Sequence, residues 1–100
     1  MNEVEELTKA LDVAAKYFDS RGFLVWSSDA RESIVRINSG DLEAINHLCL
    51  KYAPTCEVEE LFITEYEQEN ESNIVELNEA LAKVINSTYT ALERVQSAIT

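Results

Sequence analysis

The most reactive side chains of this sequence are one histidine, His47, and two thiols, Cys49 and Cys56. A cysteine nucleophile needs a base that faces it. His47 and Cys49 are two positions apart on a predicted helix and therefore point to different faces. Cys56 could approach His47 only across the fold. The positions of these residues therefore do not indicate a catalytic thiol. Two reduced cysteines are the ordinary state in a cytoplasm.

Metal and phosphate sites need spacings that this chain lacks. No His follows a Glu by three positions, as paired-helix di-metal sites require, and no HExxH motif occurs. The alternating Glu65, Glu67 and Glu69 lack the central glycine of a calcium loop. Gly22 and Gly40 lie eighteen residues apart, so no glycine-rich phosphate loop exists. We therefore expect neither an enzyme nor a bound metal or other cofactor.

Carboxylates are the abundant chemical group, and they are unevenly distributed. The chain has 19 acids and 8 bases, for a net charge of −11. Residues 52–82 carry nine acids and no Lys or Arg, whereas residues 1–51 carry nine acids and six bases. Direct binding to nucleic acid is disfavoured because phosphates require the opposite charge. A basic protein partner is favoured.

The acidic run within residues 57–71 is the candidate partner-binding site. Its simplest interpretation is a solvated loop that keeps the protein soluble. Recognition is favoured by aromatic residues in or near the run, Tyr66, Phe62 and Tyr52, because aromatics supply the contact area of binding hot spots. The predicted partner-binding residues are Glu57, Glu59, Glu60, Glu65, Tyr66, Glu67, Glu69 and Glu71.

The elements that position these residues are predicted to be helices. Two Gly and one Pro in 100 residues leave few turns, and helical periodicity dominates. We predict one all-α domain, a small bundle of four to five helices, with helices over 3–20, 27–39, 42–52 and 73–100. Residues 55–68 are ambiguous, and a short helix is favoured there over an extended segment.

The last predicted helix, 73–100, organises the rest. It would be roughly 40 Å long, with Asn73 as its cap and Glu76 completing a capping box. The apolar side of so long a helix must pack against the earlier helices, or against a second copy in a homodimer. Its broad apolar stripe consists of Ile74, Leu77, Leu81, Val84, Thr88, Ala91, Val95 and Ala98, widened by Ile85, Leu92 and Ile99.

The connections between the first three helices have recognisable signals. Gly22 is a natural helix stop, and an apolar connector is expected over residues 23–26, with Trp26 as a core anchor. Gly40 suits a left-handed turn, and Asp41 can accept hydrogen bonds from the next helix. The predicted inner faces are Val4, Leu7, Leu11, Ala14, Ala15 and Phe18, then Ala30, Ile34 and Ile37, then Leu42, Ile45, Leu48, Cys49 and Tyr52.

A distinctive order of residues runs through the middle of the chain: Trp26, then Ile34 and Ile37, the Ser39-Gly40-Asp41 step, then Ile45, Leu48 and Tyr52. With the leucine-rich final helix, it resembles a family of small bacterial helical domains of uncharacterised function, over roughly residues 10–95. Small acidic helical proteins of this kind are often immunity partners of antibacterial toxins. The chain departs from the pattern at residues 53–56, where a glycine-rich turn is expected.

Charge, architecture and this resemblance together predict a binding protein. We expect a cytoplasmic immunity or inhibitor protein that occludes a basic toxin with its acidic face. The alternative is an acidic DNA mimic or a phage anti-defence inhibitor, whose basic partner would be a nucleic-acid-binding protein. No apolar run exceeds four residues and the chain opens with acids, so neither a membrane span nor a secretory signal is expected.

Overall fold

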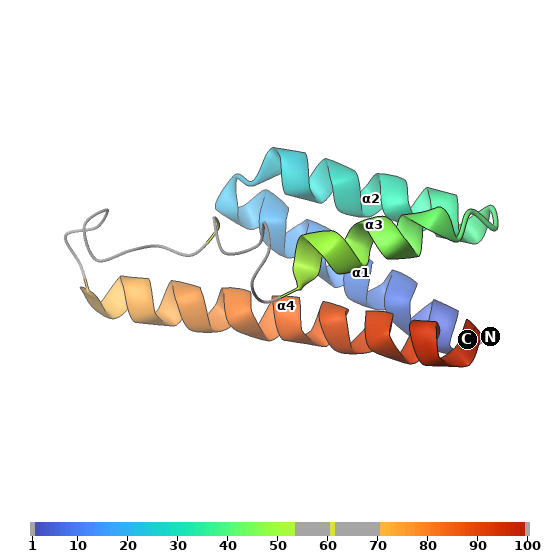
Figure 1. Ribbon diagram of the computed structural model, residues 1–100. Coiled ribbons are helices and arrows are strands. Elements are labelled where there is room, and N and C mark those ends of the chain that lie inside the picture. Colours follow the sequence, from blue (N-terminus) through green and yellow to red (C-terminus); the bar gives the residue numbers. More distant parts are fainter. Residues whose placement is uncertain (1, 54–60, 62–70, 100) are drawn as a thin grey trace.

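Four helices form an elongated bundle in a computed structural model that describes residues 2–53, 61 and 71–99, with side chains for 3–53, 61 and 75–98. They are α1 (Asn2–Arg21), α2 (Leu24–Asn38), α3 (Glu43–Tyr52) and α4 (Glu71–Ile99) (Figure 1). The Cα extents are 45 × 22 × 19 Å. No strand occurs in these ranges, so the all-α prediction with a long C-terminal helix is confirmed.

The core lies where α1 meets its neighbours. α1 packs along both α2 and α4, while the shorter α3 closes the bundle against α4 and α2. Phe18 is at the centre, with its ring centroid 5.7 Å from that of Trp26 and 6.4 Å from that of Tyr52. Trp26 is therefore the core anchor that the sequence predicted. The largest fully buried side chains include Leu7, Leu11, Phe18, Ile45, Leu48, Tyr52, Leu81, Leu92 and Val95.

The predicted connector over residues 23–26 is wrong, because α2 already begins at Leu24. Gly22 adopts a φ of +76° and closes α1. The amide of Phe23 donates to the carbonyl of Phe18 at 2.8 Å, which completes the turn in two residues. Ser27, predicted to start the helix, instead lies within its first turn, with its amide donating to the Phe23 carbonyl.

The turn between α2 and α3 follows the prediction except at one residue. Gly40 has a φ of +90°, and the Asp41 carboxylate accepts a hydrogen bond from the amide of Glu43 at 3.2 Å. Leu42 was predicted to face inward, but it precedes α3 and its side chain is 49% exposed. Ala44, in the first turn of α3, is buried instead.

Asp41 also links the two helices through Arg36, whose Nε donates to the Asp41 carboxylate at 2.9 Å. This hydrogen bond, more than any other cause, holds the pKa of Asp41 below its ordinary value. A carboxylate with a lowered pKa stabilises the fold above its unfolded-state pKa of about 4, and that contribution is lost as the pH falls through the folded-state pKa.

We therefore predict that Asp41→Asn lowers stability at pH 7 but not in strong acid. Asparagine retains the acceptor for the Glu43 amide and loses the charge that faces Arg36. The melting temperatures of parent and variant should differ at neutral pH and converge only as the pH falls through the folded-state pKa of Asp41, which lies below its ordinary value, because the parent carboxylate is then protonated as well. A gap that persists unchanged into acid would mean that the Arg36 pair does not stabilise the turn.

The long helix matches its predicted stripe in the centre and departs from it at the ends. Leu81, Ile85, Thr88, Leu92 and Val95 are buried. Ala98, predicted to face inward, is exposed. Asn73 is not a cap, because α4 begins two residues earlier at Glu71. The side chains of Ile74 and Ile99 lie outside the described residues, as does the segment 55–68 apart from Leu61, which packs against the core.

Candidate functional site

Almost all of the predicted partner-binding residues lie outside the described part of the chain. The described part of the chain contains neither the backbone nor the side chains of Glu57, Glu59, Glu60, Glu65, Tyr66, Glu67 and Glu69. Glu71 is the first residue of α4, and its side chain is likewise outside. The described residues therefore show the charge and the shape of the bundle to which this candidate site is attached.

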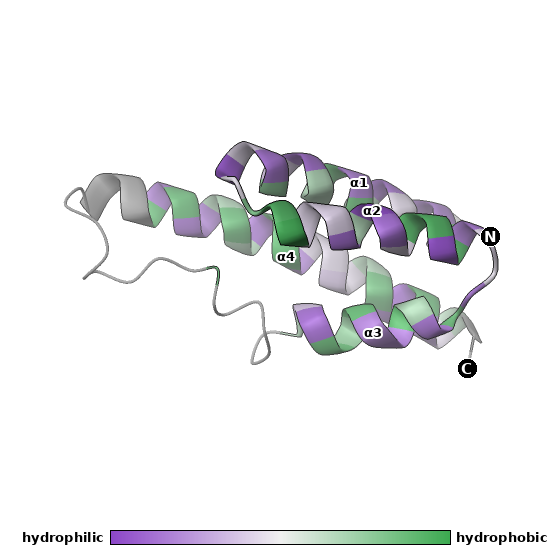
Figure 2. Cartoon of the chain, turned by 90° about the horizontal axis from the view of Figure 1, so that it is seen from above, coloured by the Kyte–Doolittle hydropathy of each residue, from purple (hydrophilic) through white to green (hydrophobic). Residues whose placement is uncertain are grey.

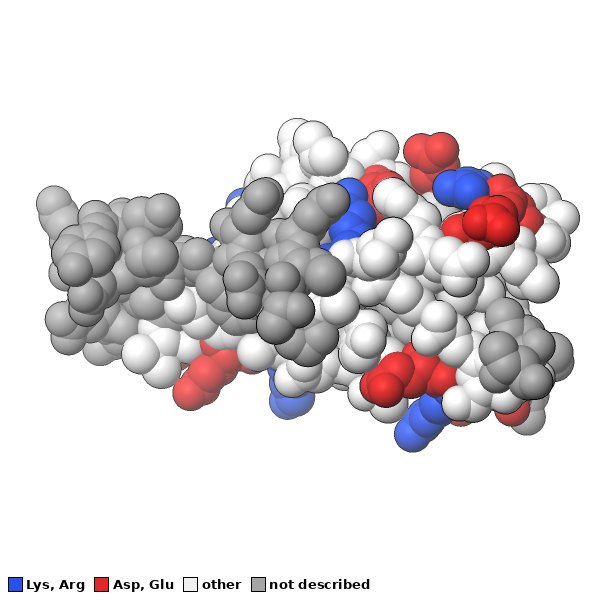
Figure 3. Space-filling model, in the orientation of Figure 1, with Lys and Arg blue, Asp and Glu red and all other residues white. Residues whose placement is uncertain are grey.

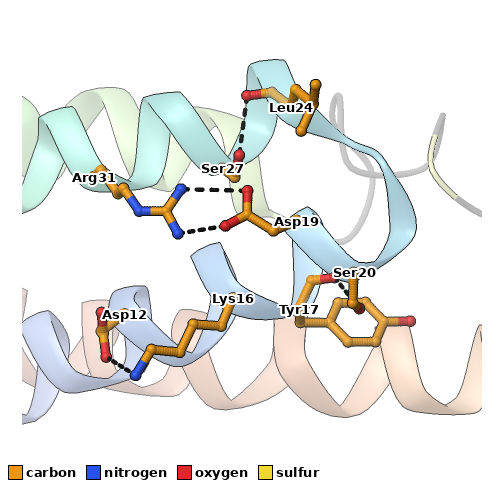
Figure 4. Close-up of polar contacts among 8 residues, drawn as sticks. All are labelled: Asp12, Lys16, Tyr17, Asp19, Ser20, Leu24, Ser27 and Arg31. Atoms are coloured by element: carbon orange, nitrogen blue, oxygen red, sulfur yellow. Dashed lines mark hydrogen bonds and ion pairs between the residues drawn. The ribbon is translucent and has the colours of Figure 1, made fainter.

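The cations of the bundle are largely paired with carboxylates of the same bundle. Arg31 of α2 forms a two-pronged ion pair with Asp19 of α1, with Nη1 to Oδ1 at 3.3 Å (Figure 4). Further ion pairs join Lys16 to Asp12 at 3.0 Å, Arg36 to Asp41 at 2.9 Å, Lys51 to Asp29 at 3.6 Å and Arg94 to Glu6 at 3.1 Å.

These pairs affect the titration of their carboxylates. The hydrogen bond from Arg31 is the main reason that the pKa of Asp19 lies below its ordinary value, and Ser27 adds to the effect. On the face drawn in Figure 3, acidic and basic side chains of the described residues lie beside one another. The fields of a close pair of opposite charges largely cancel at a distance, because the pair acts as a dipole whose field falls off faster than that of a single charge.

Charge is consequently segregated between the bundle and the acidic run. All eight bases fall on described side chains, together with twelve of the 19 acids. The other seven acids are the seven glutamates of the predicted partner-binding site. The acidic run thus carries a charge of −7 without a base, and the rest of the chain, with twelve acids and eight bases, carries the other −4.

A second group of polar side chains gathers where α2 crosses α3. His47 Nε2 lies 3.0 Å from Oδ1 of Asp29, and Lys51 Nζ lies 3.6 Å from Oδ2. Lys51 also stands over the Trp26 ring at 4.5 Å from its centroid, a cation–π contact. Beside this group is a cleft of about 410 Å³ lined by Leu24, Val25, Ser28, Asp29, Glu32 and Lys51.

Two buried oxygens at this crossing have no hydrogen-bond partner among the described residues, Oδ2 of Asp29 and the hydroxyl of Tyr52. Burial raises the pKa of Tyr52, and the nearby Asp29 charge adds to it. The Tyr52 phenol therefore stays neutral at physiological pH. Oδ2 of Asp29 faces the Lys51 ammonium at 3.6 Å, and Oδ1 contacts His47, so both oxygens of this carboxylate face groups of α3.

Removing the Tyr52 hydroxyl is expected to leave stability unchanged or to raise it. A buried hydroxyl without a hydrogen bond carries a desolvation penalty of about 1–3 kcal/mol, which phenylalanine avoids. Tyr52→Phe should melt at or above the parent temperature, whereas Tyr52→Ala should lose about 3–5 kcal/mol because it removes a fully buried ring that packs against Phe18 and Trp26. A clear loss of stability in Tyr52→Phe would mean that the hydroxyl has a partner after all.

The rim of this cleft is apolar and exposed. Leu24 and Val25, in the first turn of α2, are 64% and 77% exposed. The start of α2 is coloured as strongly hydrophobic in Figure 2. Lys51 lies on the same cleft and is the penultimate residue of α3. The rim therefore lies close to the point where the chain leaves α3 toward the acidic run. The sequence prediction missed it because residues 23–26 were assigned to a connector.

Of the residues that first suggested chemistry, Cys49 and His47 belong to the described part of the chain. Cys49 is half-buried, and burial is the main reason that its pKa is raised, which makes it a poor nucleophile. Cys56 lies outside that part. The partner of His47 is Asp29, eighteen residues earlier on another helix. The one signal in the sequence was Lys51, one helical turn after His47 and on the same face.

Two negative findings concern metals and membranes. Within residues 2–53, 61 and 71–99, no three His, Cys, Asp or Glu side chains come together as a metal site. None of the helices described is long and apolar enough to cross a bilayer.

Compared with known proteins, the chain matches no family model, no curated protein and no solved structure. The resemblance to small bacterial helical domains therefore stays an expectation.

Proposed function

We propose that this protein binds a basic protein and neutralises it by covering its functional surface, as a toxin immunity protein does. The observation that carries the proposal is the charge segregation. Five cations of the bundle are paired with carboxylates of the bundle. The seven glutamates of the acidic run have no Lys or Arg near them in the sequence. An unbalanced acidic segment steers a basic partner toward one place on the molecule.

The cleft between α2 and α3 supports the same function. Its exposed Leu24 and Val25 offer apolar contact area that charge alone does not supply, and burying apolar surface favours association. Asp29 and Glu32 on the same cleft favour a basic side chain there. The proposed interface thus combines the acidic run, which steers the partner, with the cleft, which anchors it. We propose that the protein acts in the cytoplasm.

The proposal is tested by affinity capture from the native cell, followed by titration of the purified captured protein. The parent chain and a Val25→Glu variant serve as baits, with Val35→Glu as the matched control. Val35 is also an exposed valine of α2, at 67%, and does not line the cleft. The proposal expects a basic protein that the parent and Val35→Glu bind and inhibit, and that Val25→Glu binds at least about tenfold more weakly.

Two outcomes would contradict the proposal. A partner with an acidic surface would remove the role assigned to charge. A partner that binds DNA, and that DNA displaces competitively, would favour the DNA-mimic alternative over toxin immunity, because a mimic occupies the nucleic-acid site itself.

A further inference from the structure

A groove between α1 and α4 is a separate surface from the α2–α3 cleft. Its apolar part, of about 370 Å³, is lined by Lys9, Ala10, Val13, Lys83, Val84 and Ser87. Val13 is 59% exposed there although it belongs to the central helix of the bundle. The groove continues toward the chain ends beside Thr90 and Ala91, as far as the Arg94–Glu6 ion pair that spans it.

The lining residues follow the spacing of a helix-binding seam. Ala10 and Val13 are three apart on α1, and Val84, Ser87 and Ala91 are three and four apart on α4. A helix laid along two others contacts each of them at alternating steps of three and four residues. The side chains are small or short, so a third helix axis could approach to the usual 8–10 Å.

Charge at this groove is opposite in sign to that of the whole molecule. Lys9 and Lys83 directly precede Ala10 and Val84, so one lysine flanks each wall. In the described part of the chain they are the two cations that make no ion pair, hydrogen bond or ring contact. Glu5 and Glu79 lie four residues before them, but exposed pairs of that kind are weak and leave the lysines available.

We propose that this groove binds an amphipathic helix of another protein whose apolar seam is flanked by acidic residues. The seam would cover Val13 and Val84, and the flanking carboxylates would pair with Lys9 on one wall and Lys83 on the other. Flanking charges at these positions select partners in helical assemblies. The surface and its residues are independent of the acidic run, so the two proposals stand or fall separately.

The test uses two synthetic peptides of about 21 residues, three heptads, with leucine along the seam. One carries glutamate at the flanking positions and the other carries lysine. Each is titrated by fluorescence anisotropy with the full-length protein at 0.15 M salt. The parent should prefer the glutamate peptide by about tenfold or more, because each flanking contact changes from attraction to repulsion. Amide resonances of Val13 and Val84 should shift on binding.

Charge reversal at the groove should reverse that preference. In Lys9→Glu/Lys83→Glu the lysine peptide should bind more tightly than the glutamate peptide. Lys16→Glu is the matched control, since Lys16 is exposed on α1 and pairs with Asp12 outside this groove. It should retain the parent's preference. All three substituted side chains are exposed, so circular dichroism should show an unchanged fold.

Four results would overturn the proposal. They are equal affinity for the two peptides, a preference for the lysine peptide in the parent, an unchanged preference in the double variant, and amide shifts confined to α2 and α3. Self-association that shifts Val13 and Val84 without peptide would assign the groove to a second copy instead. Binding of the groove to anionic vesicles in place of the glutamate peptide would assign it to a membrane surface.

Discussion

Leu92→Asp should unfold the protein or bring it close to unfolding at 25 °C. Leu92 is fully buried on the core face of α4. An aspartate there either stays ionised without a partner or takes up a proton, and both states cost several kcal/mol. The leucine's packing is lost as well. Small domains are stable by only about 5–15 kcal/mol, so the helical signal should vanish at a much lower temperature or denaturant concentration. Leu81→Asp should behave alike.

Asn86→Asp is the control for this prediction. Asn86 is exposed on the same helix, six residues before Leu92. An aspartate at that position should change stability by about half a kcal/mol or less. If Leu92→Asp melted like Asn86→Asp, the described stripe of α4 would not face a core, and the bundle would be packed in another way.

Reversing four glutamates of the acidic run to lysine should nearly abolish partner binding while the fold persists. The residues are Glu65, Glu67, Glu69 and Glu71. The sequence predicts a polar loop at or beside these positions, and surface charges contribute about 1 kcal/mol or less each to stability, so we expect the fold to persist. Electrostatic steering by an acidic segment can raise an association rate constant by a factor of about 10–10³. Most of the lost affinity should therefore appear as slower association.

The control must change the net charge equally without touching the run. Glu3, Glu5, Glu43 and Glu93 lie on helices of the bundle, so reversing them to lysine shifts the net charge by the same amount. The account expects a much smaller loss of binding in this variant. Equal losses in both variants would mean that total charge, and not the acidic run, attracts the partner.

Helical periodicity predicted the architecture and most of the core correctly. Leu7, Leu81 and Leu92 each occupy the predicted inner face and are fully buried. This works because a helix of 3.6 residues per turn converts sequence spacing directly into a face. The turn at Gly40 and Asp41 was equally predictable, since its conformation and hydrogen bond are local to a few residues.

Features that depend on contacts between helices could not be predicted in the same way. Val25 and Trp26 are residue types that favour strands, yet α2 begins at Leu24 and includes both of them. The Asp29–His47 contact depends on how α2 and α3 align, which no local spacing reveals. The cleft between α2 and α3 depends on that alignment, and the α1–α4 groove depends on how α1 packs along α4. The acidic run was found from composition alone, because a charge run needs no tertiary information.

The central claim is that the acidic run recruits a basic partner by electrostatic steering. The most direct test is stopped-flow measurement of the association rate constant with the purified partner, between about 0.02 and 0.5 M salt. The parent is compared with the variant in which Glu65, Glu67, Glu69 and Glu71 are replaced by lysine. The account predicts a parent rate constant that falls steeply with salt and a variant rate constant that is slow at low salt and nearly insensitive to it or rises with it. A variant that associates as fast as the parent, with the same salt dependence, would contradict the account.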